Sequence, residues 1–167
     1  MKIRNEITDT DVWKGKNLKK YLIIHHTASS PKTTFQGIIN FFKRKDDISV
    51  HYTVGYNGEV AQLANENDRC WHCGVSQWNG DKNLNNCSIG IEVLSDGVSF
   101  TDRQRDTMLE LCSMISKRNH IPVCNILRHA DIAPKRKTDI GFNFYAKWGD
   151  WNGFQDAVLE YAMKHLK

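Results

Sequence analysis

The chain has 167 residues, of which 40% are hydrophobic and 25% charged, and this length and composition are typical of one folded globular domain. No run approaches the ~18 apolar residues of a membrane span, so we expect no stable membrane insertion. The net charge of +4 is spread along the chain, and its densest cluster, Lys135–Lys137, is too small to predict nucleic-acid binding. Segment 1–20 lacks the apolar stretch of a secretory signal, so we expect cytoplasmic synthesis without a signal peptide.

The first periodic segments predict a strand followed by a helix. Tyr21–Ile24 is a short apolar run that is typical of a buried strand. Thr33 and Gln36 have the spacing of a capping box and predict the start of a helix. The apolar face of that helix is expected to carry Phe35, Ile38, Ile39 and Phe42.

A hairpin and a long polar segment are expected next. Asn57-Gly58 separates two strand-like stretches, residues 51–56 and 59–63, and predicts a two-residue turn between antiparallel strands. Residues 68–86 are polar and rich in Gly and Asn, which predicts a long surface loop.

The following segments predict another strand and a buried helix. Ser88–Leu94 alternates, so that Gly90 and Glu92 face the side opposite its aliphatic residues. Thr101 and Gln104 repeat the capping-box spacing. The helix that they start is expected to bury Met108, Leu111, Cys112 and Ile115.

The end of the chain completes an alternation of strands and helices. Val123–Leu127 is another short apolar run, and residues 151–167 have the pattern of a terminal amphipathic helix. We therefore expect an α/β fold, a single domain over residues 1–167 with a mixed central β-sheet flanked by helices.

Five cysteines occur in the chain, and Cys70 and Cys73 have the spacing of half a zinc knuckle. No second pair with this spacing follows, and the pair lies in a polar segment instead of opening a helix after a strand. Unlinked thiols are therefore the favoured interpretation, while a redox or structural-metal role stays open.

Two of the seven histidines come at strand ends, where side chains from different strands converge. His25 follows the apolar run Tyr21–Ile24, and His129 follows the strand predicted before it. Pro134 prevents a continuous helix after His129, so a carboxylate ten positions later, Asp139, can return beside it. Two imidazoles and one carboxylate make a three-ligand zinc site with a fourth position open for water.

Four segments in this order resemble a known enzyme family. They are residues 23–28 (Ile-Ile-His-His-Thr-Ala), 71–76 (Trp-His-Cys-Gly-Val-Ser), 88–92 (Ser-Ile-Gly-Ile-Glu) and 129–139. Together they resemble the zinc-dependent N-acetylmuramoyl-L-alanine amidases of the type 2 family, over roughly residues 21–139. That family includes phage lysozyme-type amidases, cytosolic anhydromuropeptide amidases and peptidoglycan recognition proteins. The resemblance implies a shallow cleft with one zinc ion.

The resemblance also implies a set of site residues. The zinc ligands are expected to be His25, His129 and Asp139. Glu92 matches the general base, and Lys137 matches the lysine that stabilises the developing oxyanion. His51 and His72 match cleft positions near the substrate. Val50 stands where lysozyme-type members carry a tyrosine, which moves the proton-handling role onto Glu92.

The expected reaction is zinc-dependent hydrolysis of the amide bond between N-acetylmuramic acid and L-alanine in peptidoglycan or a muropeptide, by a monomer. A phage-type endolysin that causes cell-wall lysis is favoured, because the chain reads as one catalytic domain and residues 25–51 form a short segment. Such an enzyme would act on the wall after release through the inner membrane. The pattern of Glu92, Lys137 and Trp71-His72 supports the alternative, a cytosolic anhydromuropeptide-recycling amidase. A non-catalytic muropeptide-binding regulator is the third possibility.

Overall fold

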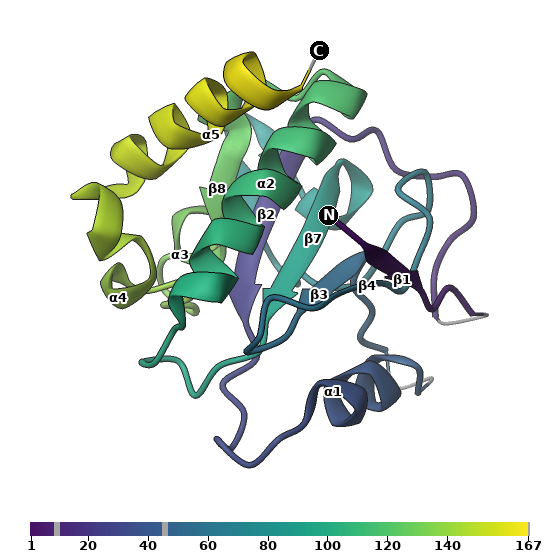
Figure 1. The fold of residues 1–167 in the computed structure, drawn as a ribbon. Helices are drawn as coiled ribbons and strands as arrows, with labels where there is room; N and C mark the ends of the chain where they lie inside the picture. Colours follow the sequence, from purple (N-terminus) through teal and green to yellow (C-terminus); the bar gives the residue numbers. More distant parts are fainter. Residues whose placement is uncertain (9–10, 45–46, 167) are drawn as a thin grey trace.

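The computed structural model describes residues 1–8, 11–44 and 47–166, and within these residues six strands form one mixed sheet (Figure 1). Its order is β1-β4-β3-β7-β2-β8. These strands are β1 Ile3–Asn5, β2 Tyr21–His26, β3 Tyr52–Val54, β4 Val60–Gln62, β7 Ser88–Val93 and β8 Ile126–Arg128. β2 runs parallel to its neighbours β7 and β8, whereas β3 and β4 are antiparallel. The predicted α/β class with a mixed central sheet is confirmed.

Two long helices, α2 (Asp102–Asn119) and α5 (Trp151–His165), cover one face of the sheet (Figure 1). Alternation along β2 and β7 points their aliphatic side chains at these helices. The resulting core contains Leu22, Ile24, Ile89, Ile91, Val93, Met108, Leu111, Cys112, Ile115, Phe154 and Val158. The Ser113 hydroxyl donates to the backbone carbonyl of Val158 at 2.8 Å and joins the two helices.

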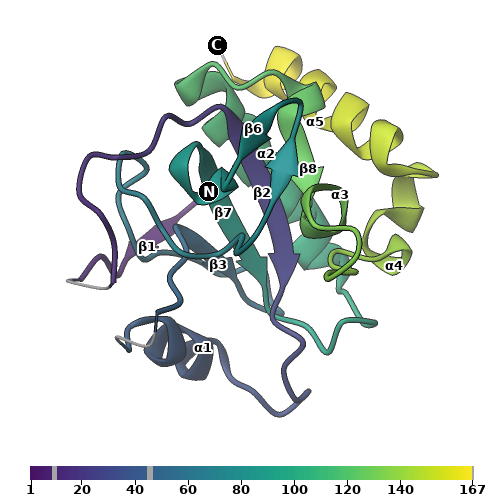
Figure 2. The ribbon, with the colours of Figure 1, turned by 180° about the vertical axis from the view of Figure 1, so that it is seen from behind.

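Shorter elements cover the opposite face (Figure 2). They are α1 Phe35–Phe42, the small hairpin β5 Gln77–Trp78 and β6 Asp81–Lys82, and α3 His129–Ile132. Tyr21, Ile23 and Leu127 of the sheet pack there with Leu84 and Ile132. A further short helix, α4 Phe142–Tyr145, precedes α5, and 3-10 turns occupy Leu84–Asn86, Val123–Asn125 and Ala146–Trp148. On this face a cavity lies between the carboxyl ends of β2 and β7 and helix α1.

The two predicted helix starts have different outcomes. At α2, the Thr101 hydroxyl accepts from the Gln104 backbone N–H while the Gln104 side chain accepts from the Thr101 N–H, so the capping box is confirmed. At α1 the prediction is wrong by one residue: Thr34, not Thr33, caps the helix and accepts from the Gly37 N–H. The amide of Gln36 therefore bonds sideways to Asn40 instead of closing a capping box.

The hairpin is confirmed, but its connection is longer than predicted. The Gly58 N–H donates to the Gly55 carbonyl at 3.0 Å, and the Gly55 N–H donates to Glu59. Gly58 itself has a φ of 78°. The loop thus has three residues, a tight turn followed by a left-handed residue, which is the usual alternative to a two-residue turn.

The polarity of segment 68–86 predicted a long surface loop, and this prediction is wrong. Cys70, Cys73 and Leu84 in it are fully buried. The segment folds over the sheet because buried polar groups, notably the side chain of Asn85, satisfy its backbone N–H groups. Within the described residues the five cysteines are free thiols, and a redox or structural-metal role for Cys70 and Cys73 stays an open alternative.

The last predicted elements are shifted at their ends. Val123–Asn125 forms a 3-10 turn, so the strand predicted over residues 123–127 is restricted to β8. The terminal helix begins at Trp151 behind the capping carboxylate of Asp150, as the pattern indicated, while Lys167 lies outside the described residues. Among the described helices, none combines the length and the apolar character needed to cross a bilayer.

Candidate metal centre and active site

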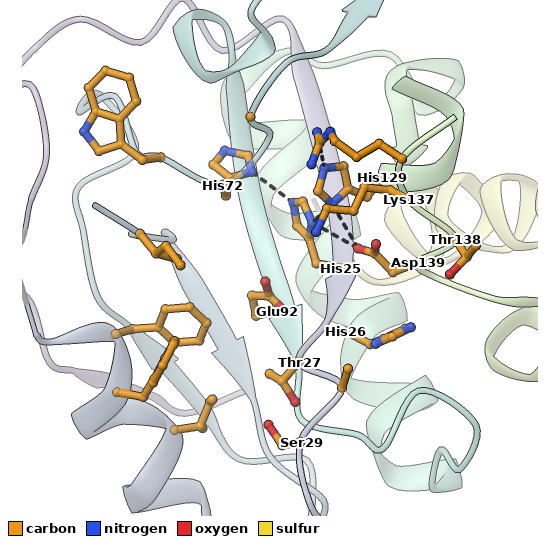
Figure 3. Close-up of a pocket in the computed structure, with 18 of the residues that line it drawn as sticks. His25, His26, Thr27, Ser29, His72, Glu92, His129, Lys137, Thr138 and Asp139 are labelled. Carbon is orange, nitrogen blue, oxygen red and sulfur yellow. Dashed lines mark hydrogen bonds and ion pairs between the residues drawn. The ribbon is translucent and has the colours of Figure 1, made fainter. Parts of the chain in front are cut away.

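Three side chains from separate segments meet where β2 and β8 end (Figure 3). His25 lies near the end of β2, His129 follows β8 directly, and Asp139 returns from the loop beyond α3. The His25 Nδ1 and His129 Nδ1 atoms are 2.8 Å apart. The Asp139 Oδ2 atom lies 3.1 Å from His129 Nδ1 and 3.3 Å from His25 Nδ1. The three residues that the sequence singled out as ligands are therefore brought together.

The spacing and chemistry of these donor atoms fit a zinc ion. Tetrahedral zinc with bonds of about 2.0–2.1 Å places its ligand atoms about 3.3 Å apart, close to the separations found here. The His129 Nε2–H donates to the backbone carbonyl of Cys73 at 3.0 Å, so its Nδ1 carries the free lone pair. All three side chains are buried. Two neutral imidazoles and one carboxylate are a donor set that zinc accepts.

The surroundings of this group favour the protonation states that a metal requires. Burial lowers the pKa of His25 to about 4, although Asp139 opposes the change, so the imidazole is neutral at pH 7. Burial alone would raise the pKa of Asp139, but the adjacent imidazoles of His129 and His25 hold it below its ordinary value. At neutral pH His25 and Asp139 thus offer unprotonated donor atoms.

Glu92 lies next to His25 across the pairing of β7 with β2. Its side chain is half-buried and points into the same cavity (Figure 3). Its Oε2 atom is buried and finds no hydrogen-bond partner among the described residues. Burial, and secondarily the charge of Asp139, raises the pKa of Glu92 to about 8, while the charge of Lys137 opposes this rise. An unpartnered carboxyl with a high proton affinity is suited to proton transfer.

Lys137 reaches the same cavity from the loop that carries Asp139. The two residues alternate with the exposed Thr138, and the Lys137 backbone N–H donates to the carbonyl of Ala133 at 2.9 Å. The charge of Lys137 lowers the pKa of both His25 and Glu92, which indicates that its ammonium group lies near them. The cavity therefore places the Lys137 cation beside its carboxylates.

The cavity has a volume of about 710 Å³, and three groups of residues border it. One wall contains the polar group just described, and the other is the apolar side of α1 with Ile38, Phe41 and Phe42. Trp71 and His72 close a third side. A cleft of this size, in which several polar groups converge opposite an apolar wall, is suited to a small-molecule ligand.

The two histidines predicted to lie near the substrate occupy different positions. His72 is buried and lines the cavity. His51 is fully buried and is absent from the described residues that line the cavity. Its Nδ1 accepts from the Gly90 N–H at 3.0 Å, and its Nε2–H donates to the Asp68 carbonyl at 2.9 Å. Both ring nitrogens of His51 are thus used within the fold.

A second group of donor atoms shares His25 with the first. His25, His72 and Cys73 also lie close enough together to hold an ion. Burial raises the pKa of the Cys73 thiol to about 12, which keeps the sulfur protonated at neutral pH. Because a metal binds the thiolate form, the group with Asp139 is the better metal site.

Two polar residues that the sequence analysis missed hold the site's walls in place. The Asn85 side-chain oxygen accepts from the backbone N–H groups of His72 and Cys73, at 3.0 and 2.7 Å. The Arg136 guanidinium donates to the carbonyls of Cys73 and Val75 at 2.6 and 3.0 Å, joining the loop after α3 to segment 68–86. No local sequence pattern marks these contacts, which depend on tertiary structure.

Comparison with known proteins places the chain in a family. The family described as N-acetylmuramoyl-L-alanine amidase matches residues 15–142. The chain belongs to this family. The resemblance that its four sequence segments suggested is confirmed.

Individual members of the family support the assignment. The 1,6-anhydro-N-acetylmuramyl-L-alanine amidase AmpD of Haemophilus influenzae is 34% identical over 154 residues, covering 82% of this chain and 81% of that protein. A crystal structure of AmpD has a TM-score of 0.78 at 25% identity and covers 93% of both chains. The amidase AmiD of Escherichia coli, solved with anhydro-N-acetylmuramic acid-L-Ala-D-gamma-Glu-L-Lys, has a TM-score of 0.69 at 33% identity and covers 83% of this chain and 57% of that chain.

The likeness to more distant structures shows the fold alone. A mutant endolysin from Bacillus subtilis has a TM-score of 0.73 at 21% identity, covering 95% of this chain and 99% of that chain. With family membership established, the prediction of an N-acetylmuramoyl-L-alanine amidase is confirmed.

Proposed function

We propose that this amidase holds one zinc ion through His25, His129 and Asp139 and hydrolyses the N-acetylmuramic acid–L-alanine bond of soluble anhydromuropeptides. The observation that carries the proposal is the meeting of three metal-donor atoms within 3.3 Å of one another. They lie in a cavity that also contains the unpartnered carboxyl of Glu92.

Glu92 is the proposed general base and acid. When bound, a zinc ion supplies Lewis-acid chemistry that polarises the scissile carbonyl and acidifies water. The buried Oε2 atom of Glu92 has a free lone pair, with which it accepts the proton of the attacking water. Its high proton affinity allows it to hold that proton and then to deliver it to the leaving amine of L-alanine.

Lys137 is the proposed stabiliser of negative charge on the scissile carbonyl oxygen. Its ammonium group faces the cavity from the segment that carries Asp139. A fixed cation at the position where charge develops lowers the barrier, and losing such a group costs on the order of 100-fold in rate.

The proposed substrate is the soluble anhydromuropeptide instead of the intact cell wall. The relatives named as 1,6-anhydro amidases and the AmiD complex with an anhydromuramyl peptide support this choice. The endolysin role favoured from the sequence rests on the organisation as one catalytic domain and on the short segment 25–51, and the likeness to an endolysin structure, at 21% identity, supports the fold alone. The comparisons therefore favour the recycling alternative. Three further expectations stay predictions: that residues 1–167 act as one catalytic domain, that the protein is a monomer, and that it is synthesised without a signal peptide.

Parallel digestion of two substrates tests the proposal. The zinc-loaded protein is incubated with purified anhydromuropeptides and with intact sacculi, and mass spectrometry detects release of peptides with a free L-alanine amino terminus. We expect rapid cleavage of the soluble substrate, little release from sacculi, and loss of both with Glu92→Gln. Preferential digestion of sacculi would restore the endolysin role, and cleavage that persists after chelation would refute the zinc assignment.

A further inference from the structure

The imidazole of His25 is contacted on both of its nitrogens. While Nδ1 faces His129 and Asp139, Nε2 lies 3.0 Å from Nδ1 of His72 (Figure 3). The two rings meet edge to face with centroids 5.1 Å apart, and both are buried. Neither ring nitrogen of His25 therefore depends on solvent for a partner.

The position of one proton follows from these contacts. A neutral imidazole that presents the Nδ1 lone pair carries its only N–H on Nε2. In His25 this N–H points at His72 Nδ1, which must then act as the acceptor and leave the His72 proton on its own Nε2. The tautomers of the two rings are thereby linked.

The surroundings of the other ring nitrogen of His72, Nε2, are consistent with a proton on that atom. Its Nε2 lies 3.4 Å from the hydroxyl oxygen of Ser88. That hydroxyl uses its single proton to donate to the Leu84 carbonyl at 2.6 Å, so its oxygen is free to accept. The hydrogen bonds therefore run in one direction, from His25 through His72 and Ser88 to a backbone carbonyl that can only accept.

We propose that His72 is a positioning residue that fixes the ring orientation and tautomer of His25, so that Nδ1 is presented to the metal. This inference rests on the proposed function, because it takes His25 as a metal ligand. Partners behind a metal-bound histidine commonly contribute 10–100-fold to metal affinity, on the order of what we expect here.

His72 is itself held by its surroundings. Its backbone N–H donates to Asn85, and its ring lies directly over Gly90 of β7. A Cβ atom at position 90 would be 2.5 Å from His72 Nδ1, so only glycine leaves room for the ring. The ring also meets that of His51 in a T-shaped arrangement, with centroids 5.8 Å apart. Gly90 and His51 thus support the site without contacting the metal donors.

Zinc affinity of matched variants tests the proposal. Competition with a chromophoric chelator measures zinc binding by the wild type, His72→Ala and His72→Asn, since the Asn oxygen restores an acceptor at the position of Nδ1. We expect about 10–100-fold weaker binding for His72→Ala and recovery of most of it in His72→Asn. Gly90→Ala, which displaces the ring and leaves every proposed ligand in place, should weaken binding in the same direction. His165→Ala, an exposed imidazole on α5, is the control.

Nitrogen-15 NMR of the zinc-loaded protein gives a readout independent of activity. We expect His72 to have an unprotonated Nδ1 and a protonated Nε2. A His72→Ala variant that folds and binds zinc within about threefold of the wild type, or a protonated His72 Nδ1, would overturn the inference while leaving the proposed function intact. Absence of zinc binding by the wild type would instead refute the proposed function. Urea unfolding of each variant identifies a loss of binding caused by misfolding.

Discussion

Replacing Glu92 with glutamine separates the cost of ionising this carboxyl from its role in catalysis. In the metal-free protein, burial raises the pKa of Glu92 from its ordinary value of 4.5 to about 8. The unfolded chain therefore loses this proton at a lower pH than the folded chain does. The contribution of Glu92 to the free energy of unfolding is largest below the pKa of the unfolded chain, 4.5, and is lost as the pH rises through the pKa of the folded protein, about 8. Glutamine, which resembles the protonated carboxyl, has no such dependence.

The size of this effect follows from the two pKa values. At about 1.36 kcal/mol per pKa unit, the wild type should lose up to about 4 kcal/mol relative to Glu92→Gln between about pH 5 and pH 9. Because the side chain is only half-buried and lines a cavity, solvent screening weakens this effect, and we expect about 2 kcal/mol.

Urea unfolding of both chelator-treated proteins across this pH range measures the difference between their free energies of unfolding. The contributions of titrating groups that the two proteins share cancel in this difference. Added zinc should reduce the difference, since a nearby cation favours the ionised carboxylate. A difference between the two proteins that does not change with pH would refute the assignment of a raised pKa to Glu92.

Three other substitutions test separate parts of the structure. Lys137→Met should lower kcat on the order of 100-fold with zinc affinity retained, whereas the exposed Lys135→Met should not; equal rates for both variants would remove Lys137 from the reaction. His129→Ala should abolish both zinc binding, measured by elemental analysis, and hydrolysis, and full activity in metal-free buffer would exclude His129 as a ligand. Leu111→Ala, in the fully buried part of α2, should lower the free energy of unfolding by about 2–5 kcal/mol in urea, and a loss below about 1 kcal/mol would contradict its place in the core.

Local patterns predicted the elements that set the site's position. The alternation of β7 indicated that Glu92 lies opposite the aliphatic residues, and it does so because those residues pack under α2 and α5. The strand-end positions of His25 and His129 indicated convergence, since β2 and β8 pair in parallel and end at the same edge. The loop broken by Pro134 then returns Asp139 to the two histidines.

Tertiary contacts decided what the patterns could not. Segment 68–86 is polar enough to predict solvent exposure, yet Asn85 and Arg136 bind its backbone groups and allow Cys73 to be buried. His51 matched a cleft position, but the Gly90 N–H and the Asp68 carbonyl, both distant in sequence, occupy its two nitrogens. Spacing along the chain carries no information about such partners.

The location of the metal tests the account most directly, because His25 belongs to two groups of donor atoms. Crystals grown with zinc and measured on both sides of the zinc absorption edge reveal the ion by its anomalous difference density. The account predicts one peak between His25 Nδ1, His129 Nδ1 and Asp139 Oδ2. A peak between His25, His72 and Cys73, or a fully zinc-loaded protein with no peak near His129, would contradict it.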